Sequence, residues 1–283
     1  MVSFLQRGKF RLHYRDEGQG PLVVCVHGNP TWGFFFRKFV EELRESHRVI
    51  VPDHLGCGLS DKPKAGEYGF RLADRIDDLE SLIHHVSPSG PLSLVVHDWG
   101  GMIGMGWASR HPQRLQRLVA MNTAAFFPPP GKKLPWQISI VRDTFLGPLL
   151  VQGLNLFSRG LVSSCATRKL PRDVREAYLS PYDSWAHRLA VLRFVQDIPM
   201  REGDPSYALV KEIEAGLGRF ADVPTLLCWG MRDFVFDADF LAGWQRRFPK
   251  AETHTFDEAH HLVMEDAGER IIPLVRRFLG PVS

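Results

Sequence analysis

The segment Val95-Val96-His97-Asp98-Trp99-Gly100-Gly101 constrains the fold of this chain more than any other. An apolar run from Leu92 to Val96 leads into it, and such a run predicts a buried strand. The residues that follow, from Gly100 to Ala108, are rich in glycine, which lets a helix lie close against a strand. The segment therefore predicts a strand, a tight turn and a helix, with the carboxylate of Asp98 at the turn.

This arrangement is typical of the nucleophile elbow of α/β-hydrolases, where a strained turn presents a serine in a G-x-S-x-G pattern. Here Asp98 takes the place of the serine. An unperturbed aspartate has a pKa of about 3.9, so we expect Asp98 to attack without help from a base. Its attack on an sp³ carbon would give an ester that water can cleave, which predicts alkyl transfer or ring opening. The alternative is that Asp98 only caps the helix that follows.

Composition excludes several classes of protein. The chain has 283 residues, a hydrophobic share of 44% and a net charge of +3 without long basic runs, so we expect no nucleic-acid partner. The four cysteines have no C-x-x-C spacing, which indicates free thiols in a reducing compartment. Residues 1–10 do not resemble a signal peptide, and no run approaches the roughly 18 apolar residues of a membrane span. We therefore expect a cytoplasmic protein that is not integral to a membrane.

Short apolar runs alternate with amphipathic segments, which predicts an α/β fold with a mostly parallel central sheet flanked by helices. We expect strands at 22–26, 48–51, 92–96, 118–121, 225–230 and 252–256, and helices near 39–43, 74–85, 237–248 and 269–279.

The alternation stops at the proline-rich residues 126–133, and about ninety residues of helical character follow, to near Phe220. We therefore predict a core domain formed by residues 1–124 and 221–283 and an inserted helical cap domain at residues 125–220. The apolar cap residues expected to roof Asp98 are Trp136, Leu149, Leu150, Leu154, Phe157, Trp185 and Phe194. The alternative is that most of them form the core of the cap itself.

Hydrolases of this fold order their triad along the chain as nucleophile, acid and base. Asp233 follows the strand at 225–230 and is the predicted acid, because Asn122, at the other usual position, cannot carry a charge. His260 and His261 follow the last strand. Physical reasoning alone does not distinguish these two histidines as the base, and either could be an ordinary loop histidine.

Several further motifs point to one family. They are His27-Gly28-Asn29-Pro30-Thr31-Trp32, His54-Leu55-Gly56-Cys57-Gly58-Leu59-Ser60-Asp61-Lys62-Pro63 and His97-Asp98-Trp99-Gly100. With them the chain resembles the haloalkane dehalogenases over nearly its whole length. The cap segments 181–185 and 194–199 are similar to the third subfamily, and most of all to its branch of β-lactone decarboxylases of bacterial long-chain olefin biosynthesis. The family's H-x-x-x-E-D pattern aligns the base with His261.

The resemblance also implies roles for Asn29 and Trp99. Their side-chain N–H groups would bind a leaving halide or lactone oxygen, and their backbone N–H groups would form an oxyanion hole. The alternatives are packing for Trp99 and helix capping for Asn29. The predicted chemistry needs no cofactor and no metal. The resemblance further implies a homo-oligomer or an assembly with other enzymes of olefin biosynthesis.

The sequence thus predicts a haloalkane dehalogenase with a small apolar substrate. Asp98 displaces a halide ion from an alkyl halide, and water activated by His261, which Asp233 orients, hydrolyses the ester to a primary alcohol. The main alternative is a β-lactone decarboxylase that converts cis-3,4-dialkyl-β-lactones to cis-alkenes and CO₂.

An epoxide hydrolase and a non-catalytic scaffold are weaker hypotheses. An epoxide hydrolase needs cap tyrosines, and Tyr178, Tyr182 and Tyr207 lie in no matching context. A non-catalytic scaffold is disfavoured because such proteins usually lose a member of the triad, and this chain has a candidate for all three.

Overall fold

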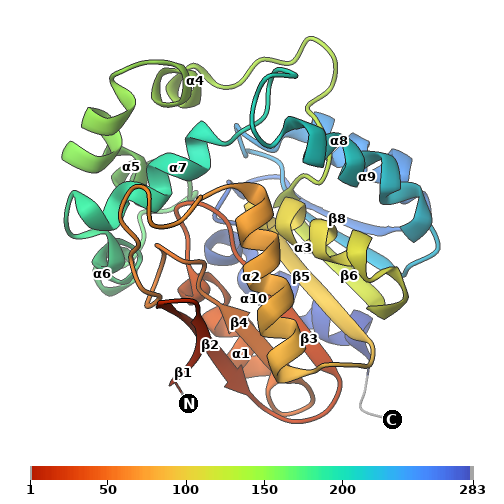
Figure 1. Ribbon diagram of the computed structural model, residues 1–283. Coiled ribbons are helices and arrows are strands. Elements are labelled where there is room, and N and C mark those ends of the chain that lie inside the picture. The colour runs from red at the N-terminus through yellow and green to blue at the C-terminus, as the bar shows by residue number, and fades with distance from the viewer. Residues whose placement is uncertain (1, 281–283) are drawn as a thin grey trace.

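A computed structural model describes residues 2–280, which form an eight-stranded sheet with helices on both faces (Figure 1). The strand order is β1-β2-β4-β3-β5-β6-β7-β8. Strand β2 pairs antiparallel with β1 and β4, and all the other pairings are parallel. The predicted α/β fold with a mostly parallel sheet is confirmed.

The strands are β1 (Val2–Arg7), β2 (Phe10–Glu17), β3 (Leu22–Val26), β4 (Arg48–Pro52), β5 (Leu92–Asp98), β6 (Leu115–Thr123), β7 (Thr225–Gly230) and β8 (Glu252–Phe256). The helices are α1 (Arg37–Leu43), α2 (Leu72–Val86), α3 (Trp99–Arg110), α4 (Trp136–Asp143), α5 (Leu156–Ser164), α6 (Arg172–Leu179), α7 (Leu189–Gln196), α8 (Tyr207–Gly216), α9 (Ala238–Arg247) and α10 (Val263–Leu279). A π-helical turn, Leu149–Gly153, lies between α4 and α5.

Two elements differ from the sequence-based expectation. The hairpin of β1 and β2 is missing from the predicted strands, although its alternation of apolar and polar residues is typical of a half-buried strand, and β1 forms the edge of the sheet. Helix α10 begins at Val263 rather than at residue 269. Its first two turns bury Val263, Met264 and Ala267, so tertiary packing extends the helix toward the N-terminus beyond its predicted start.

Alternating residues of the central strands build two separate cores. Val24 of β3 and Val96 of β5 face helices α2, α3, α8 and α9, whereas Cys25 and Val95 face α1 and α10. Burial on both faces explains why the central strands read as continuous apolar runs in the sequence.

The chain between β6 and β7 contains α4 to α8, and α4 to α7 lie together at one end of the molecule (Figure 1). This region has a small core of its own, formed by Ile138, Val141, Val151, Tyr182, Val191, Leu192 and Val195. Helix α8 instead packs on α3, with Val210 and Ile213 in the core of the sheet layer. No helix within residues 2–280 combines the length and the apolar character needed to cross a bilayer.

Candidate active site

The elbow holds Asp98 in a backbone conformation that residues other than glycine rarely adopt. Asp98 ends β5 with φ 53° and ψ −125°, and α3 starts at the next residue. Only glycines fit around this turn: a Cβ on Gly28 would lie 1.9 Å from Asp98 Oδ1, and one on Gly100 would lie 1.9 Å from the backbone oxygen of Val26. The Thr123 hydroxyl donates to the backbone oxygen of Asp98 and accepts from the Gly101 N–H. Strained turns of this kind cluster at functional sites.

The side chain of Asp98 does not cap α3, so the capping alternative fails. Its Oδ1 instead accepts a hydrogen bond of 2.6 Å from the backbone N–H of Asn29, in the loop after β3. The carboxylate is buried and lines a cavity at the ends of the central strands.

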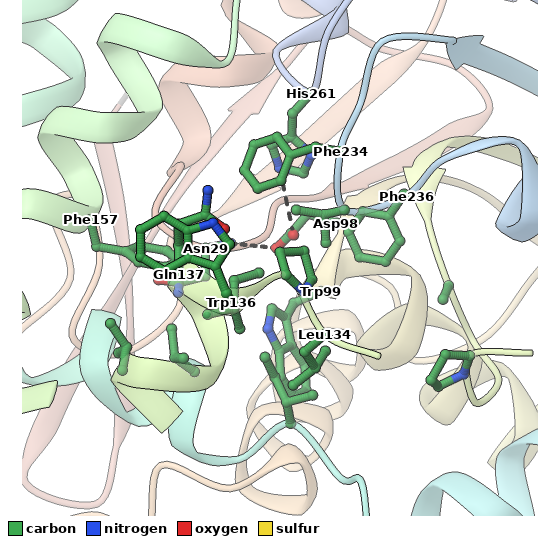
Figure 2. Close-up of a pocket in the computed structure, with 18 of the residues that line it drawn as sticks. Asn29, Asp98, Trp99, Leu134, Trp136, Gln137, Phe157, Phe234, Phe236 and His261 are labelled. Carbon is green, nitrogen blue, oxygen red and sulfur yellow. Dashed lines mark hydrogen bonds and ion pairs between the residues drawn. The ribbon is translucent and has the colours of Figure 1, made fainter. Parts of the chain in front are cut away.

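Asp98, His261 and Asp233 come together from three different loops. Figure 2 shows Asp98 between His261 and Asn29, with Trp99 beside it. His261 Nε2 lies 3.6 Å from Asp98 Oδ2, and His261 Nδ1 lies 2.7 Å from Asp233 Oδ2. The structure therefore brings together the three residues that the sequence predicts as nucleophile, base and acid. Neighbouring His260 contributes its backbone N–H to Asp266, and no contact joins it to Asp98 within the described chain.

The surroundings of Asp98 and His261 shift the pKa values of both residues. Burial raises the pKa of Asp98 to about 6, although His261 and the backbone N–H groups of Asn29 and Trp99 act in the opposite direction. Burial lowers the pKa of His261, but the carboxylates of Asp233 and Asp98 outweigh it, and that pKa rises to about 9. The pKa of Asp98 therefore lies well above the unperturbed pKa that the sequence analysis assumes. At neutral pH the pair is therefore an aspartate beside an imidazolium.

Asn122 occupies the second possible acid position and has a structural role. Its amide exchanges two hydrogen bonds with the backbone of Gly230, at 2.8 and 2.9 Å. It thereby joins the end of β6 to the end of β7, directly before the loop that carries Asp233. Asp233, rather than Asn122, contacts His261 in the structure.

The two predicted anion donors both line the cavity. Asn29 Nδ2 donates to the backbone oxygen of Val191 at 3.2 Å, which leaves one of its two N–H groups for a ligand. The indole of Trp99 packs on Phe194, with ring centroids 5.5 Å apart, and no acceptor for its Nε1–H is found within residues 2–280. Asn29 does not cap the next helix, whose first turn follows Trp32.

The cavity has a volume of about 1140 Å³ and a mainly apolar wall. Three of the seven cap residues expected to roof Asp98 line it: Trp136, Leu150 and Phe157. The expectation is wrong for the other four. Leu149, Leu154 and Trp185 are about half exposed outside the cavity, and Phe194 is buried behind Trp99. Helical periodicity identifies apolar positions but does not say which of them face the cavity rather than solvent.

The cap tyrosines lie away from the cavity wall. Tyr178 donates to Glu265 at 2.6 Å, and Tyr182 donates to the backbone oxygen of Thr31 at 3.3 Å. Tyr207 packs against Phe127. None of the three lines the cavity as residues 2–280 form it, which weakens the epoxide hydrolase hypothesis.

Sequence reasoning missed two residues that position His261. Phe236 stacks on the imidazole with centroids 6.0 Å apart, and His97 Nε2 lies 2.9 Å from the backbone oxygen of His261. Burial lowers the pKa of His97 well below its usual value, so it acts as a neutral hydrogen-bonding group. Its place beside Asp98 was the one available signal in the sequence; Phe236 gave none.

Comparison with known proteins identifies the family. Residues 21–267 match the family model for the alpha/beta hydrolase fold. The chain is 50% identical over 278 residues to a cis-3-alkyl-4-alkyloxetan-2-one decarboxylase of Shewanella oneidensis, covering 98% of this chain and 87% of the relative. It is 46% identical to a protein of the same name from Xanthomonas campestris pv. campestris, covering 95% and 92% of the two chains.

The haloalkane dehalogenases are more distant in sequence. Haloalkane dehalogenase 2 of Mycobacterium tuberculosis is 31% identical over 273 residues, covering 95% of this chain and 91% of the relative. A haloalkane dehalogenase of Agrobacterium tumefaciens shares the fold with a TM-score of 0.88 at 23% identity, covering 100% and 97% of the two chains. The chain therefore belongs to the α/β-hydrolases and, among them, to the haloalkane dehalogenase family.

Proposed function

We propose that this enzyme is a β-lactone decarboxylase that converts cis-3-alkyl-4-alkyloxetan-2-ones to cis-alkenes and CO₂. The observation that carries the proposal is the 50% identity, over 98% of the chain, to a relative named for that activity. The named dehalogenases reach 31%, so the comparisons favour this reaction over the halide hydrolysis that the sequence first predicted. The cavity supports it, because a large apolar wall suits a substrate with two alkyl chains.

In the first step, Asp98 attacks C4, the saturated ring carbon that is bonded to the ring oxygen. The C4–O bond breaks, its electron pair stays on the ring oxygen, and the former lactone becomes a free carboxylate. The product is an ester between Asp98 and C4, with inverted configuration at C4. We expect the N–H groups of Asn29 and Trp99 to stabilise the departing oxygen, since both side chains line the cavity beside Asp98.

In the second step, the bond between C3 and the carboxylate breaks and releases CO₂. Its electron pair forms the C3=C4 double bond, and the C4–O bond to Asp98 breaks and restores the carboxylate. Inversion followed by anti elimination keeps the two alkyl groups on the same side, so a cis-lactone gives a cis-alkene. An apolar cavity favours this step because it disfavours the charge of the substrate carboxylate.

His261 has an electrostatic role in this reaction. Neither step requires water or a proton transfer, and an imidazolium 3.6 Å from Asp98 stabilises the carboxylate both as nucleophile and as leaving group. Asp233 holds the ring and its charge through the 2.7 Å contact to Nδ1. In the same proposal, residues 125–220 form the cap domain over a core of residues 1–124 and 221–283.

Haloalkane hydrolysis is the second candidate function, and the position of His261 favours it. Once Asp98 is esterified it loses its charge, which removes one of the causes that raise the pKa of His261. The imidazole can then accept a proton from water that attacks the ester. The triad therefore allows hydrolysis whenever the bound alkyl group carries no carboxylate to lose.

Parallel product analysis tests the proposal. The enzyme is offered a cis-3,4-dialkyl-β-lactone and a 1-bromoalkane in separate reactions, with Asp98→Asn as the matched inactive control, and products are identified by gas chromatography. We expect the lactone to give the cis-alkene with the higher kcat/KM. Bromide release without alkene formation would reject the decarboxylase in favour of the dehalogenase.

A further inference from the structure

The outer surface of the cap between residues 131 and 172 is both apolar and basic. This stretch contains seven Lys or Arg residues and one Asp, a net charge of +6 in a chain whose total is +3. Its large exposed apolar side chains are Trp136, Phe145, Leu146, Leu149, Leu154 and Leu156. Phe145 is 89% exposed. Exposed apolar groups at this density mark interaction sites.

Part of the positive charge is neutralised by neighbouring carboxylates, and Arg172 pairs with Glu176. Arg142 pairs with Asp143 and Asp204, and Lys132 pairs with Asp237 and Asp239. Four other basic side chains of the stretch are exposed and form no ion pair within residues 2–280: Lys133, Arg159, Arg168 and Lys169. Their charge is therefore available to an anionic partner.

Part of this surface borders the opening of the cavity. Trp136, Leu146 and Leu156 line the cavity and are also exposed, so they lie at its rim. Phe234, from the loop after β7, is half exposed and lines the rim from the opposite domain. Helices α4 and α5 lie at the end of the molecule away from the chain termini (Figure 1).

We propose that this face, residues 133–169 together with Phe234, docks on the surface of a bilayer that contains anionic lipids. Apolar side chains that enter the interface, with basic side chains beside them, are the chemistry of interfacial membrane binding. A second copy of this chain that pairs through the same face is a poor occupant, because two such basic faces would repel one another. Docking would place the cavity opening against the lipid, so an apolar lactone passes from bilayer to Asp98 without crossing water. This last point rests on the proposed function, whereas the docking does not.

Vesicle sedimentation tests the docking without any substrate. The full chain is mixed with vesicles of phosphatidylcholine alone or with phosphatidylglycerol added, at low and high salt. We expect binding to the anionic vesicles that weakens with salt, and little binding to the neutral ones. Phe145→Ser with Leu149→Ser, and separately Arg159→Glu with Lys169→Glu, should each weaken binding by more than about tenfold. None of these four residues lines the cavity, so turnover of a soluble short-chain lactone should be unchanged.

The matched controls are Phe4→Ser on β1 and Arg276→Glu on α10, which replace an exposed apolar and an exposed basic residue outside the cap. They should bind vesicles as the wild type does. Equal loss in the controls, or no preference of the wild type for anionic vesicles, would overturn the proposal. A third result would also overturn it: the wild type self-associates, as seen by light scattering, the cap variants abolish this self-association, and no vesicle binding is observed. Because lactone turnover is assayed separately, either proposal can fail alone.

Discussion

Asp98 lies where burial and a neighbouring imidazolium act on its charge in opposite directions. Burial dominates and raises its pKa to about 6, while the two carboxylates around His261 raise the pKa of that residue to about 9. Between these values Asp98 is a carboxylate and His261 is an imidazolium. The proposed decarboxylation uses this charge state in both steps.

The first prediction concerns pH. We expect kcat/KM for lactone decarboxylation to rise as pH increases through about 6, because protonated Asp98 cannot attack. We expect it to fall as pH increases through about 9, because neutral His261 no longer stabilises the carboxylate. The two limbs belong to the coupled pair rather than to either residue. A pH–rate profile measures them, and His261→Gln should lack the upper limb. A rate that is constant across both values would contradict this charge assignment.

His261→Gln should also separate the two candidate reactions. With a 1-bromoalkane, Asp98 can still be alkylated, but water is not activated, so about one bromide per site is released and the protein mass increases by the alkyl group. With the cis-lactone, turnover should continue at a rate reduced by about 10²-fold, because an electrostatic stabiliser is lost but no water is needed. Assays at a pH above neutrality but below the His261 pKa of about 9 favour ionised Asp98 and keep His261 charged in the wild type.

His260→Gln is the control for this variant. His260 makes no contact with Asp98 within residues 2–280, so both reactions should keep near wild-type rates. Steady bromide turnover by His261→Gln would reject His261 as the base, and an exchange of the two phenotypes would assign that role to His260.

At the scale of elements, the elbow depends on how closely α3 approaches β3. A Cβ on Gly100 would meet the backbone of Val26, which cannot move without displacing the strand. Gly160, in α5, has open space around its Cβ position. A methyl group on Gly100 would therefore clash with β3, whereas a methyl group on Gly160 would meet no other part of the protein.

We expect Gly100→Ala to reduce the free energy of unfolding by about 2 kcal/mol or more, as overpacking does. Gly160→Ala should increase it by about 0.5 to 1 kcal/mol through helix propensity. Chemical denaturation of both variants measures the difference. Equal stabilities would mean that α3 does not need this close approach.

The sequence predicts best those elements that are buried along their whole length, because all their residues are then apolar. Leu22–Val26 is buried along its whole length, and its apolar run is therefore an unambiguous strand. The first turns of α10 escape prediction because packing between helices leaves a weak local signal, whereas the β1–β2 hairpin has an alternating strand pattern that the longer apolar runs obscured. Asp233 is predictable from its place after β7, whereas the raised pKa of Asp98 depends on burial that only the assembled site reveals.

At the scale of the whole molecule, the cap and the core together create the cavity. Asp98 and His261 come from loops at the sheet, while Trp136, Leu150 and Phe157 come from the cap. The sequence predicts an inserted cap but does not predict which apolar residues of that segment line the cavity. The proposed substrate suits the assembled cavity, because an apolar wall accepts alkyl chains and carries few groups that would hold water at Asp98.

The most direct test of the central claim is isotopic. In a single turnover of the cis-lactone in ¹⁸O-labelled water, we predict a cis-alkene and no label in the peptide of residues 95–102, because no water attacks the Asp98 ester. A 1-bromoalkane is the positive control and should place ¹⁸O in the same peptide. A β-hydroxy acid together with labelled Asp98, or alkene formed at the wild-type rate by Asp98→Asn, would contradict the proposed decarboxylation at Asp98.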